Sequence, residues 1–210
     1  MPDITLEIRR IPRPGKTFEI IEAVTAALEA SGRRGLVSTA VTVPHNGDRD
    51  IVTAIPFSSW GELEELNDTV LSDTAFRKQQ TAIEELCVKT PTIQALNVIV
   101  RGDQLAGNRS KYLRRNFMIA KRGEAPALVD TLLEWREAIA AGSRPTVQRP
   151  VSGSQDLVRV TAGYESLNAL MEAGADVASN PAYSKFREQL NRLTVSVMGY
   201  NSRIVYSKTG

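Results

Sequence analysis

This 210-residue chain carries one order of residues twice, with matching positions 106 to 108 residues apart. The clearest matches are Asp50–Val52 with Asp156–Val158, and Ser72–Lys78 with Ser179–Lys185. Single positions match in the same order: Ser59 with Ser166, Leu63 with Leu170, Val70 with Val177, Ile83 with Leu190 and Leu86 with Leu193. Agreement in order over some 90 residues predicts a tandem duplication, because architectures built of repeats leave this trace in a sequence.

Each half has the periodicities of the same small set of elements. Ile4, Leu6 and Ile8 alternate with polar residues, which predicts a half-buried strand, and residues 17–31 have helical spacing. The other elements expected in the first half are strands at 36–43, 49–57 and 93–100 and helical segments from Trp60 and from Asp73 to Leu86. Those expected in the second half are strands at 112–119, 146–149, 157–162 and 195–206, and helices around 128–139, at 166–177 and after Asn180.

The order β-α-β-β-α-β is that of a ferredoxin-like unit, whose antiparallel sheet has helices on one face only. Its bare face must be covered, and a second copy can cover it. We therefore predict an α+β fold in which two ferredoxin-like repeats form one pseudo-dimeric α+β barrel. The expected division is a first repeat at residues 1–100, a linker at 101–109 and a second repeat at 110–210.

Composition limits the expected location of the protein and its expected partners. No apolar run approaches the ~20 residues of a bilayer crossing and no secretory leader is evident, so we expect a cytoplasmic protein without a membrane partner. The single cysteine, Cys87, excludes an internal disulfide. Residues 1–106 hold 11 basic and 15 acidic side chains, and residues 107–210 hold 15 and 9. The basic run from Arg109 to Arg122 lacks the aromatic pattern of RNA-binding sheets, so no nucleic-acid partner is expected.

The sequence resembles the dimeric α+β-barrel superfamily, and most of all its NIPSNAP-like branch. The first half carries the resemblance in Leu6–Arg9 leading to Pro14–Lys16, in Asp50–Val52 before Phe57–Ser59, and in Ser72–Phe76. The second half matches more loosely, through Gly123, Tyr164–Ser166 and Asn180–Tyr183.

The resemblance implies a small-molecule cavity between sheets and helices, without a cofactor. Related barrels include cofactor-free monooxygenases, haem-degrading oxygenases and chlorite dismutases, and fold alone does not choose among them. The haem branches use a histidine near the iron, whereas the single histidine here, His45, falls in an expected turn. A solvated turn residue is the better interpretation of His45, and no metal site is expected.

Three other motifs have a structural explanation. Gly15-Lys16-Thr17 lacks the upstream glycine of a phosphate-binding loop, so Gly15 is expected to be a turn residue. Cys87 is expected to pack as a small hydrophobic residue. The glutamates of residues 62–65 and 84–85 are expected on solvated helix faces.

Polar side chains on strands that should face the barrel interior are the candidate site. They are Arg9, Asn97, Arg115, Arg159 and Tyr200. One interpretation is structural: ion pairs between the halves, such as Glu7 with an arginine of the other repeat. The other is a ligand site, because a planar guanidinium suits a carboxylate.

Three functions follow as hypotheses. The first is an intrachain pseudo-dimer that binds a small anionic or aromatic molecule, with further homo-oligomerisation open. The second is a cofactor-independent monooxygenase of the antibiotic-biosynthesis type. The third is a structural or assembly module without catalysis.

Overall fold

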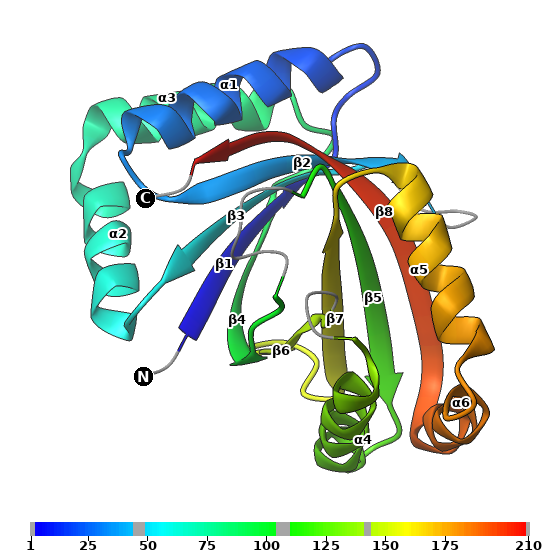
Figure 1. Ribbon diagram of the computed structural model, residues 1–210. Helices are drawn as coiled ribbons and strands as arrows, with labels where there is room; N and C mark the ends of the chain where they lie inside the picture. The colour runs from blue at the N-terminus through cyan, green and yellow to red at the C-terminus, as the bar shows by residue number, and fades with distance from the viewer. Residues whose placement is uncertain (1–2, 44–48, 104–109, 141–143, 209–210) are drawn as a thin grey trace.

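The computed structural model describes residues 3–43, 49–103, 110–140 and 144–208. The first half follows the expected order, with its second helical region split in two (Figure 1). Its elements are β1 (Asp3–Arg10), α1 (Thr17–Ala30), β2 (Gly35–Thr42), β3 (Ile51–Phe57), α2 (Trp60–Ser72), α3 (Thr74–Glu85) and β4 (Thr92–Val100). His45 lies outside the described residues.

The second half has the same order of elements. They are β5 (Tyr112–Ala120), α4 (Ala125–Ala138), β6 (Thr146–Pro150), β7 (Leu157–Tyr164), α5 (Leu167–Ser179), α6 (Tyr183–Leu193) and β8 (Thr194–Lys208). The boundaries agree with the expected ones to within a few residues. Helix α6 begins later than Asn180 suggests, because the Asn180 side chain accepts a hydrogen bond from Ala182 N in a turn before the helix.

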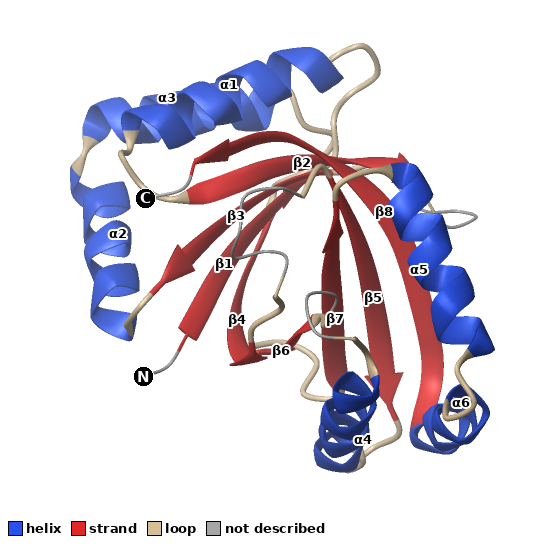
Figure 2. Ribbon diagram, viewed as in Figure 1, coloured by secondary structure: helices blue, strands red, loops and turns tan. Residues whose placement is uncertain are grey.

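The eight strands close into one barrel in the order β1-β3-β2-β8-β5-β7-β6-β4 (Figure 2). Every neighbouring pair is antiparallel. Read within each half, the order is β4-β1-β3-β2 and then β8-β5-β7-β6, so corresponding strands occupy corresponding places. The halves join where β2 pairs with β8 and where β4 pairs with β6. This confirms the predicted fold class, a pseudo-dimeric α+β barrel; the duplication itself stays a prediction.

The helices pack on the outside of the barrel, and each half has its own apolar core between helices and strands (Figure 1). Ile20, Val24 and Leu28 of α1 recur at helical spacing and are all buried in the first core. Leu128, Leu132 and Trp135 of α4 do the same in the second. No described helix combines the length and the apolar character needed to cross a membrane.

Local sequence signals explain several element boundaries. The Ser59 side chain accepts a hydrogen bond from Glu62 N at 3.2 Å and caps α2, as the serine of a capping box does. The Glu62 carboxylate instead binds the backbone N–H and the hydroxyl of Ser58. Gly15 and Gly123 both have positive φ, 80° and 85°, at the turn that follows β1 and β5. Their shared conformation agrees with the structural interpretation of Gly15.

Gly174, in the middle of α5, offers a test of this helix. A Cβ atom there would have no heavy atom within 4 Å, so Gly174→Ala is expected to raise the free energy of unfolding by roughly 0.5–1 kcal/mol. Gly35→Ala is the contrasting control, because its Cβ would lie 2.7 Å from the Ala54 carbonyl oxygen and should destabilise. Urea denaturation measures both, and a loss of stability in Gly174→Ala would contradict the placement.

Candidate functional site

Ionic groups from both halves meet inside the barrel. Glu7 of β1 and Arg159 of β7 form a bidentate ion pair, with both side chains almost fully buried. Burial alone would raise the pKa of Glu7, but the attraction and hydrogen bonds of Arg159 outweigh it and lower the pKa below its ordinary value. Contact between Glu7 and an arginine of the other half is the first of the two interpretations that the sequence left open.

A second buried carboxylate, Asp50, lies between a tyrosine and an arginine. The Tyr200 hydroxyl donates to Asp50 Oδ2 at 3.3 Å, and Arg9 Nε lies 2.5 Å from the same oxygen. Arg9 remains partly exposed, whereas Asp50 and Tyr200 are buried. Burial raises the pKa of the Tyr200 phenol, which therefore stays protonated and donates to the carboxylate.

Arg115 is the largest of the fully buried side chains in the described part of the chain. Its terminal nitrogens donate to Ser202 Oγ at 2.8 Å and to Ser38 Oγ at 3.0 Å, so it joins β5 to β8 and across to β2. Within the described residues it forms no ion pair, and its Nε has no hydrogen-bond partner. The Tyr200 ring lies beside it and stacks on Phe117 at 5.7 Å.

The structure thus brings together four of the five residues expected to bind a ligand. Arg9, Arg115, Arg159 and Tyr200 belong to this interior network, where other side chains already engage them. Asn97 does not belong to it: it is exposed and lies opposite Ile4, on the outer side of β4. The expectation that Asn97 faces the interior is wrong, because Leu96 and not Asn97 takes the buried position.

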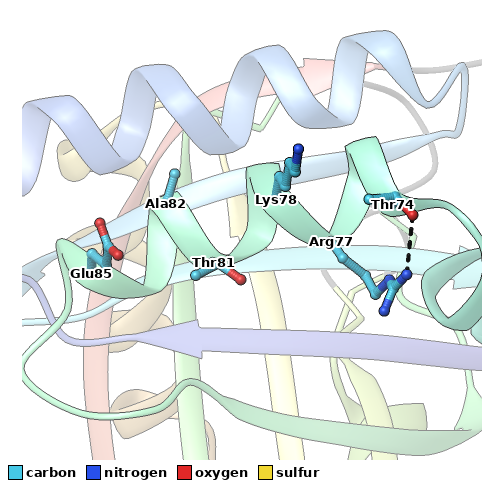
Figure 3. A pocket seen from close by; sticks show the side chains of 6 residues that line it. All are labelled: Thr74, Arg77, Lys78, Thr81, Ala82 and Glu85. Atoms are coloured by element: carbon cyan, nitrogen blue, oxygen red, sulfur yellow. Dashed lines mark hydrogen bonds between the residues drawn. The ribbon is translucent and has the colours of Figure 1, made fainter.

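The remaining sequence candidates carry no convergent chemistry. Cys87 is 2% exposed and its thiol donates to the Ile83 carbonyl, as a packed residue does. Among the described residues no three His, Cys, Asp or Glu side chains gather as a metal site would require. An open hollow of about 340 Å³ is lined by α3 alone (Figure 3). Its walls are one exposed helix face: Thr74, Arg77, Lys78, Thr81, Ala82 and Glu85.

A different polar group lies on the outer face of the second half, close to α5. We call Arg114, Asn116 and Asn201 the Arg114 site. Arg114 Nε and Nη1 each donate at 3.2 Å, to Asn116 Oδ1 and to Asn201 Oδ1 respectively. All three side chains are half-buried, and in the described part of the chain no carboxylate pairs with Arg114. The site therefore holds a cation, partly withdrawn from water, with neutral partners only.

The backbone is shaped for this group at Gly199, the neighbour of Asn116 across the β5–β8 pair. A Cβ atom at Gly199 would lie 2.4 Å from Asn116 Oδ1 and 3.0 Å from Arg114 Nη2. Real Cβ atoms do not approach so closely, so only glycine at position 199 leaves room for the Asn116 and Arg114 side chains in these positions. Sequence reasoning missed this site, although the alternation of Arg114 and Asn116 with Leu113 and Arg115 was available as a signal.

The equivalent place in the first half is apolar. Leu6 and Arg114 each stand nine residues before the positive-φ glycine of their half, and they lie opposite Ala95 and Asn201. Leu6 belongs to the first apolar core, with Ala95 packed against it. The same position of the fold is therefore occupied by an apolar core residue in the first half and by a half-buried cation in the second.

Aromatic groups surround the Arg114 site. Tyr112 lies on the same outer face of β5, with the Arg203 guanidinium 4.7 Å from its ring centre. Tyr164 lies opposite Tyr112 in β7. Burial raises the pKa of the Tyr164 phenol although Arg114 opposes the shift, so the phenol is a hydrogen-bond donor at neutral pH. Helix α5 buries only Leu170 and leaves Met171 67% exposed.

No family model and no curated protein matches the sequence. Solved structures do match over almost their whole length. A candidate monooxygenase from Fusobacterium nucleatum subsp. nucleatum superposes with a TM-score of 0.74 at 10% identity, covering 100% of this chain and 96% of the other. This chain has the fold of the dimeric α+β barrels.

Two further matches agree with that fold. An anthrone oxidase-like protein has a TM-score of 0.65 at 15% identity, with 99% of this chain and 92% of the other covered. A candidate monooxygenase from Lactobacillus acidophilus has a TM-score of 0.65 at 12% identity, with coverages of 100% and 97%. At such identities the likeness of this α+β barrel to them extends to its fold and not to its chemistry.

Proposed function

We propose that this α+β barrel binds a small anionic, aromatic molecule at the Arg114 site, between α5 and the outer face of β5 and β8. The observation that carries the proposal is the half-buried Arg114 guanidinium, whose partners among the described residues are two asparagine oxygens and no carboxylate. A cation withdrawn from water without a counter-ion favours an anion, and the planar guanidinium suits a carboxylate or phenolate.

The neighbouring side chains favour an aromatic ligand. Tyr112 and Tyr164 offer ring faces or edges beside the cation, and the Tyr164 hydroxyl can donate to a ligand oxygen. Arg203, over the Tyr112 ring, adds a second positive charge on the same face. A few convergent polar groups beside aromatic side chains are typical of small-molecule sites.

The barrel interior is the second place at which a ligand could bind, through Arg9, Arg115, Arg159 and Tyr200. The outer face is favoured because the terminal nitrogens of Arg115 and Arg159 already bind Ser38, Ser202 and Glu7. A ligand in the interior would have to replace contacts that hold opposite walls of the barrel together. On this proposal the interior network is a structural element.

The second candidate function is a cofactor-independent monooxygenase acting on an enolisable aromatic substrate. Its support is the fold of the matching structures, two of them candidate monooxygenases and one anthrone oxidase-like. At the Arg114 site, the cation and the Tyr164 phenol would stabilise an enolate or phenolate, which is the charge such a reaction develops. A NIPSNAP-like binding protein without catalysis would use the same site and omit the reaction.

Calorimetric titration with benzoate, salicylate and a dihydroxyanthrone tests the binding proposal. Arg114→Met is expected to lower the affinity of any ligand that the wild type binds by roughly 10- to 100-fold, because a charge-assisted contact is lost. Arg149→Met is the matched control, since Arg149 is also half-buried but lies on β6 and donates to Gln155. Equal affinity in Arg114→Met, or no binding by the wild type, would contradict the proposal.

Oxygen uptake separates the two candidate functions. A monooxygenase consumes oxygen with the anthrone in the wild type and loses that activity in Arg114→Met. A protein that binds the anthrone and consumes no oxygen is a binding protein only.

A further inference from the structure

Strand β8 is much longer than its counterpart in the other half. It has 15 residues, whereas β4 has 9. The strand registers show which residues of β4 and β8 correspond. Leu6 and Arg114 are equivalent, and they pair with Ala95 and Asn201, so Ala95 corresponds to Asn201. Thr92, the first residue of β4, therefore corresponds to Met198. The beginning of β8, from Thr194 to Val197, corresponds in the first half to residues 87–91, which are not a regular strand and form only the isolated bridge between Cys87 and Pro12.

This additional length has a partner strand on one side only. Residues 194–203 pair with β5, but pairing with β2 begins at Asn201. In the described part of the chain, no strand lies along the other edge of residues 194–200. Ala120 N donates to the carbonyl oxygen of Asp156, just before β7. Backbone N–H and C=O groups alternate in direction along a strand, so those of even-numbered β5 residues point toward β7 and those of odd-numbered residues toward β8. Their partners Met198 and Tyr200 therefore direct their backbone groups toward β5, which leaves those of Val197 and Gly199 directed toward the open edge, and the register shift at Val195 lies just before them.

The open edge is apolar and has neither charges nor prolines, and its one irregularity is the register shift beside Val195 at its beginning. Val195 is 64% exposed, and Val197 and Met198 are each 51% exposed. No residue from 194 to 201 is charged and none is proline. Natural edge strands are usually protected by charges, prolines or bulges, because unpaired backbone groups recruit another strand.

We propose that residues 194–200 of β8 pair antiparallel with the same residues of a second copy of this chain. Antiparallel pairing of a strand with itself has two-fold symmetry, so a single contact covers both open edges and closes the assembly. Centred on Val197, the pairing sets Val195 of one copy opposite Gly199 of the other. Ser196 is then opposite Met198, and Val197 is opposite Val197.

These pairs fit one another by size and charge. Gly199 has no side chain, so it leaves room for the branched Val195 of the second copy. Two valines at the axis form the β-branched contact that stabilises cross-strand pairs. Symmetry places like residues together, and here it brings no like charges into contact, because the segment is uncharged. A different protein strand would gain no such match.

The arrangement also brings the second copy to the Arg114 site. Gly199 lies directly beside Asn116 and Arg114, so Val195 of the second copy would form part of the wall of that site. The dimer does not depend on ligand binding, and the two proposals fail separately: one by the measured mass, the other by calorimetry.

Sedimentation velocity on the full chain tests the dimer. The wild type is expected at twice the mass of one chain, and Val197→Lys at the mass of one chain with an unchanged melting temperature. Val205→Lys is the matched control: it adds the same charge to an exposed valine of β8 where β2 covers the edge, and it should remain a dimer. A monomeric wild type, or a dimeric Val197→Lys, overturns the proposal.

A crosslink covers the case in which Val197→Lys does not fold. Facing residues of a hydrogen-bonded antiparallel pair have Cα atoms about 5.5 Å apart, which a disulfide can bridge. Val197→Cys should form a disulfide-linked dimer on oxidation, while Val205→Cys should not. The native Cys87 is buried and will not interfere. Failure of Val197→Cys to crosslink, in a folded protein, also overturns the proposal.

Discussion

Replacing Glu7 with alanine is expected to lower the free energy of unfolding by about 3–5 kcal/mol, because it leaves Arg159 charged, buried and unpaired. Arg159 is 2% exposed and, among the described residues, its terminal nitrogens bind only Glu7. In the wild type, burial would lower the pKa of Arg159, but Glu7 outweighs it and raises the pKa. Without Glu7 the guanidinium still keeps its proton at neutral pH, because arginine is not deprotonated in proteins, so the cost of the buried charge stays. Urea denaturation at neutral pH measures the loss.

The double variant Glu7→Leu with Arg159→Met separates the ion pair from the packing around it. Exchanging both partners for apolar side chains of similar size removes two desolvated charges together, so the double variant should recover most of the stability. Glu19→Ala is the surface control: Lys16 and Glu19 are both about half exposed, and breaking such a pair costs less than about 1 kcal/mol. A double variant as unstable as Glu7→Ala would contradict the assignment.

The same pair predicts an acid sensitivity. The pKa of Glu7 is lowered in the folded protein, so its contribution to stability is fully present above the ordinary glutamate pKa of 4.5 and is lost as the pH falls through the folded value. Below pH 4.5 the wild type should lose stability more steeply than the double variant. Parallel curves for the two proteins would show that Glu7 does not titrate with unfolding.

The second large effect is expected from dividing the chain. We propose that residues 1–100 and 110–210 are the two repeats and 101–109 the linker, and that neither repeat forms a stable barrel with a second copy of itself. A self-paired first half would bury two Glu7 carboxylates without Arg159. A self-paired second half would bury Arg115 and Arg159 twice over, with no acid from Glu7 or Asp50 to face them.

The physical reason is that the charges inside the barrel are divided between the halves. The register places Glu7 and Arg115 at equivalent positions, each opposite the middle of its neighbouring strands. One half contributes an acid where the other contributes a base, so only the mixed pair is neutralised. Side chains rather than backbone topology would thus select the partner.

Two fragments, residues 1–103 and 110–210, test this by gel filtration and circular dichroism. Each alone is expected to lack a cooperative thermal transition, and the mixture is expected to form a one-to-one complex that has one. Glu7→Leu in the first fragment should weaken this preference by removing the acid. A stable barrel from either wild-type fragment alone would contradict the proposal.

Much of the architecture could be predicted from periodicity, since the helices and strands repeat in order and the bare sheet faces require a cover. Individual strand faces were harder. In Thr92–Val100, apolar residues occupy both parities, as Leu96 and Ile99 do, so the pattern does not decide which face is buried. Asn97 was placed on the wrong side for that reason.

The interior network could be only partly predicted. Alternation indicated the inward face for Arg159, because it lies between Val158 and Val160. It gave no such signal for Arg115, which lies between the polar residues Arg114 and Asn116. The partner of Glu7 is 152 residues away along the chain, and it follows only from how the barrel closes. The Arg114 site depends on Gly199 in a distant strand, and no local pattern joins Gly199 to Asn116.

The distance along the chain between Glu7 and Arg159 has a consequence for biosynthesis. A ribosome completes the whole first half well before it reaches residue 159, so Glu7 of the emerging half has no arginine partner until β7 is made. Contacts between such remote residues make folding slow and leave intermediates exposed. The barrel should therefore close only after translation has passed β8, which joins β2 to β5, and chaperones would meet an open sheet until then.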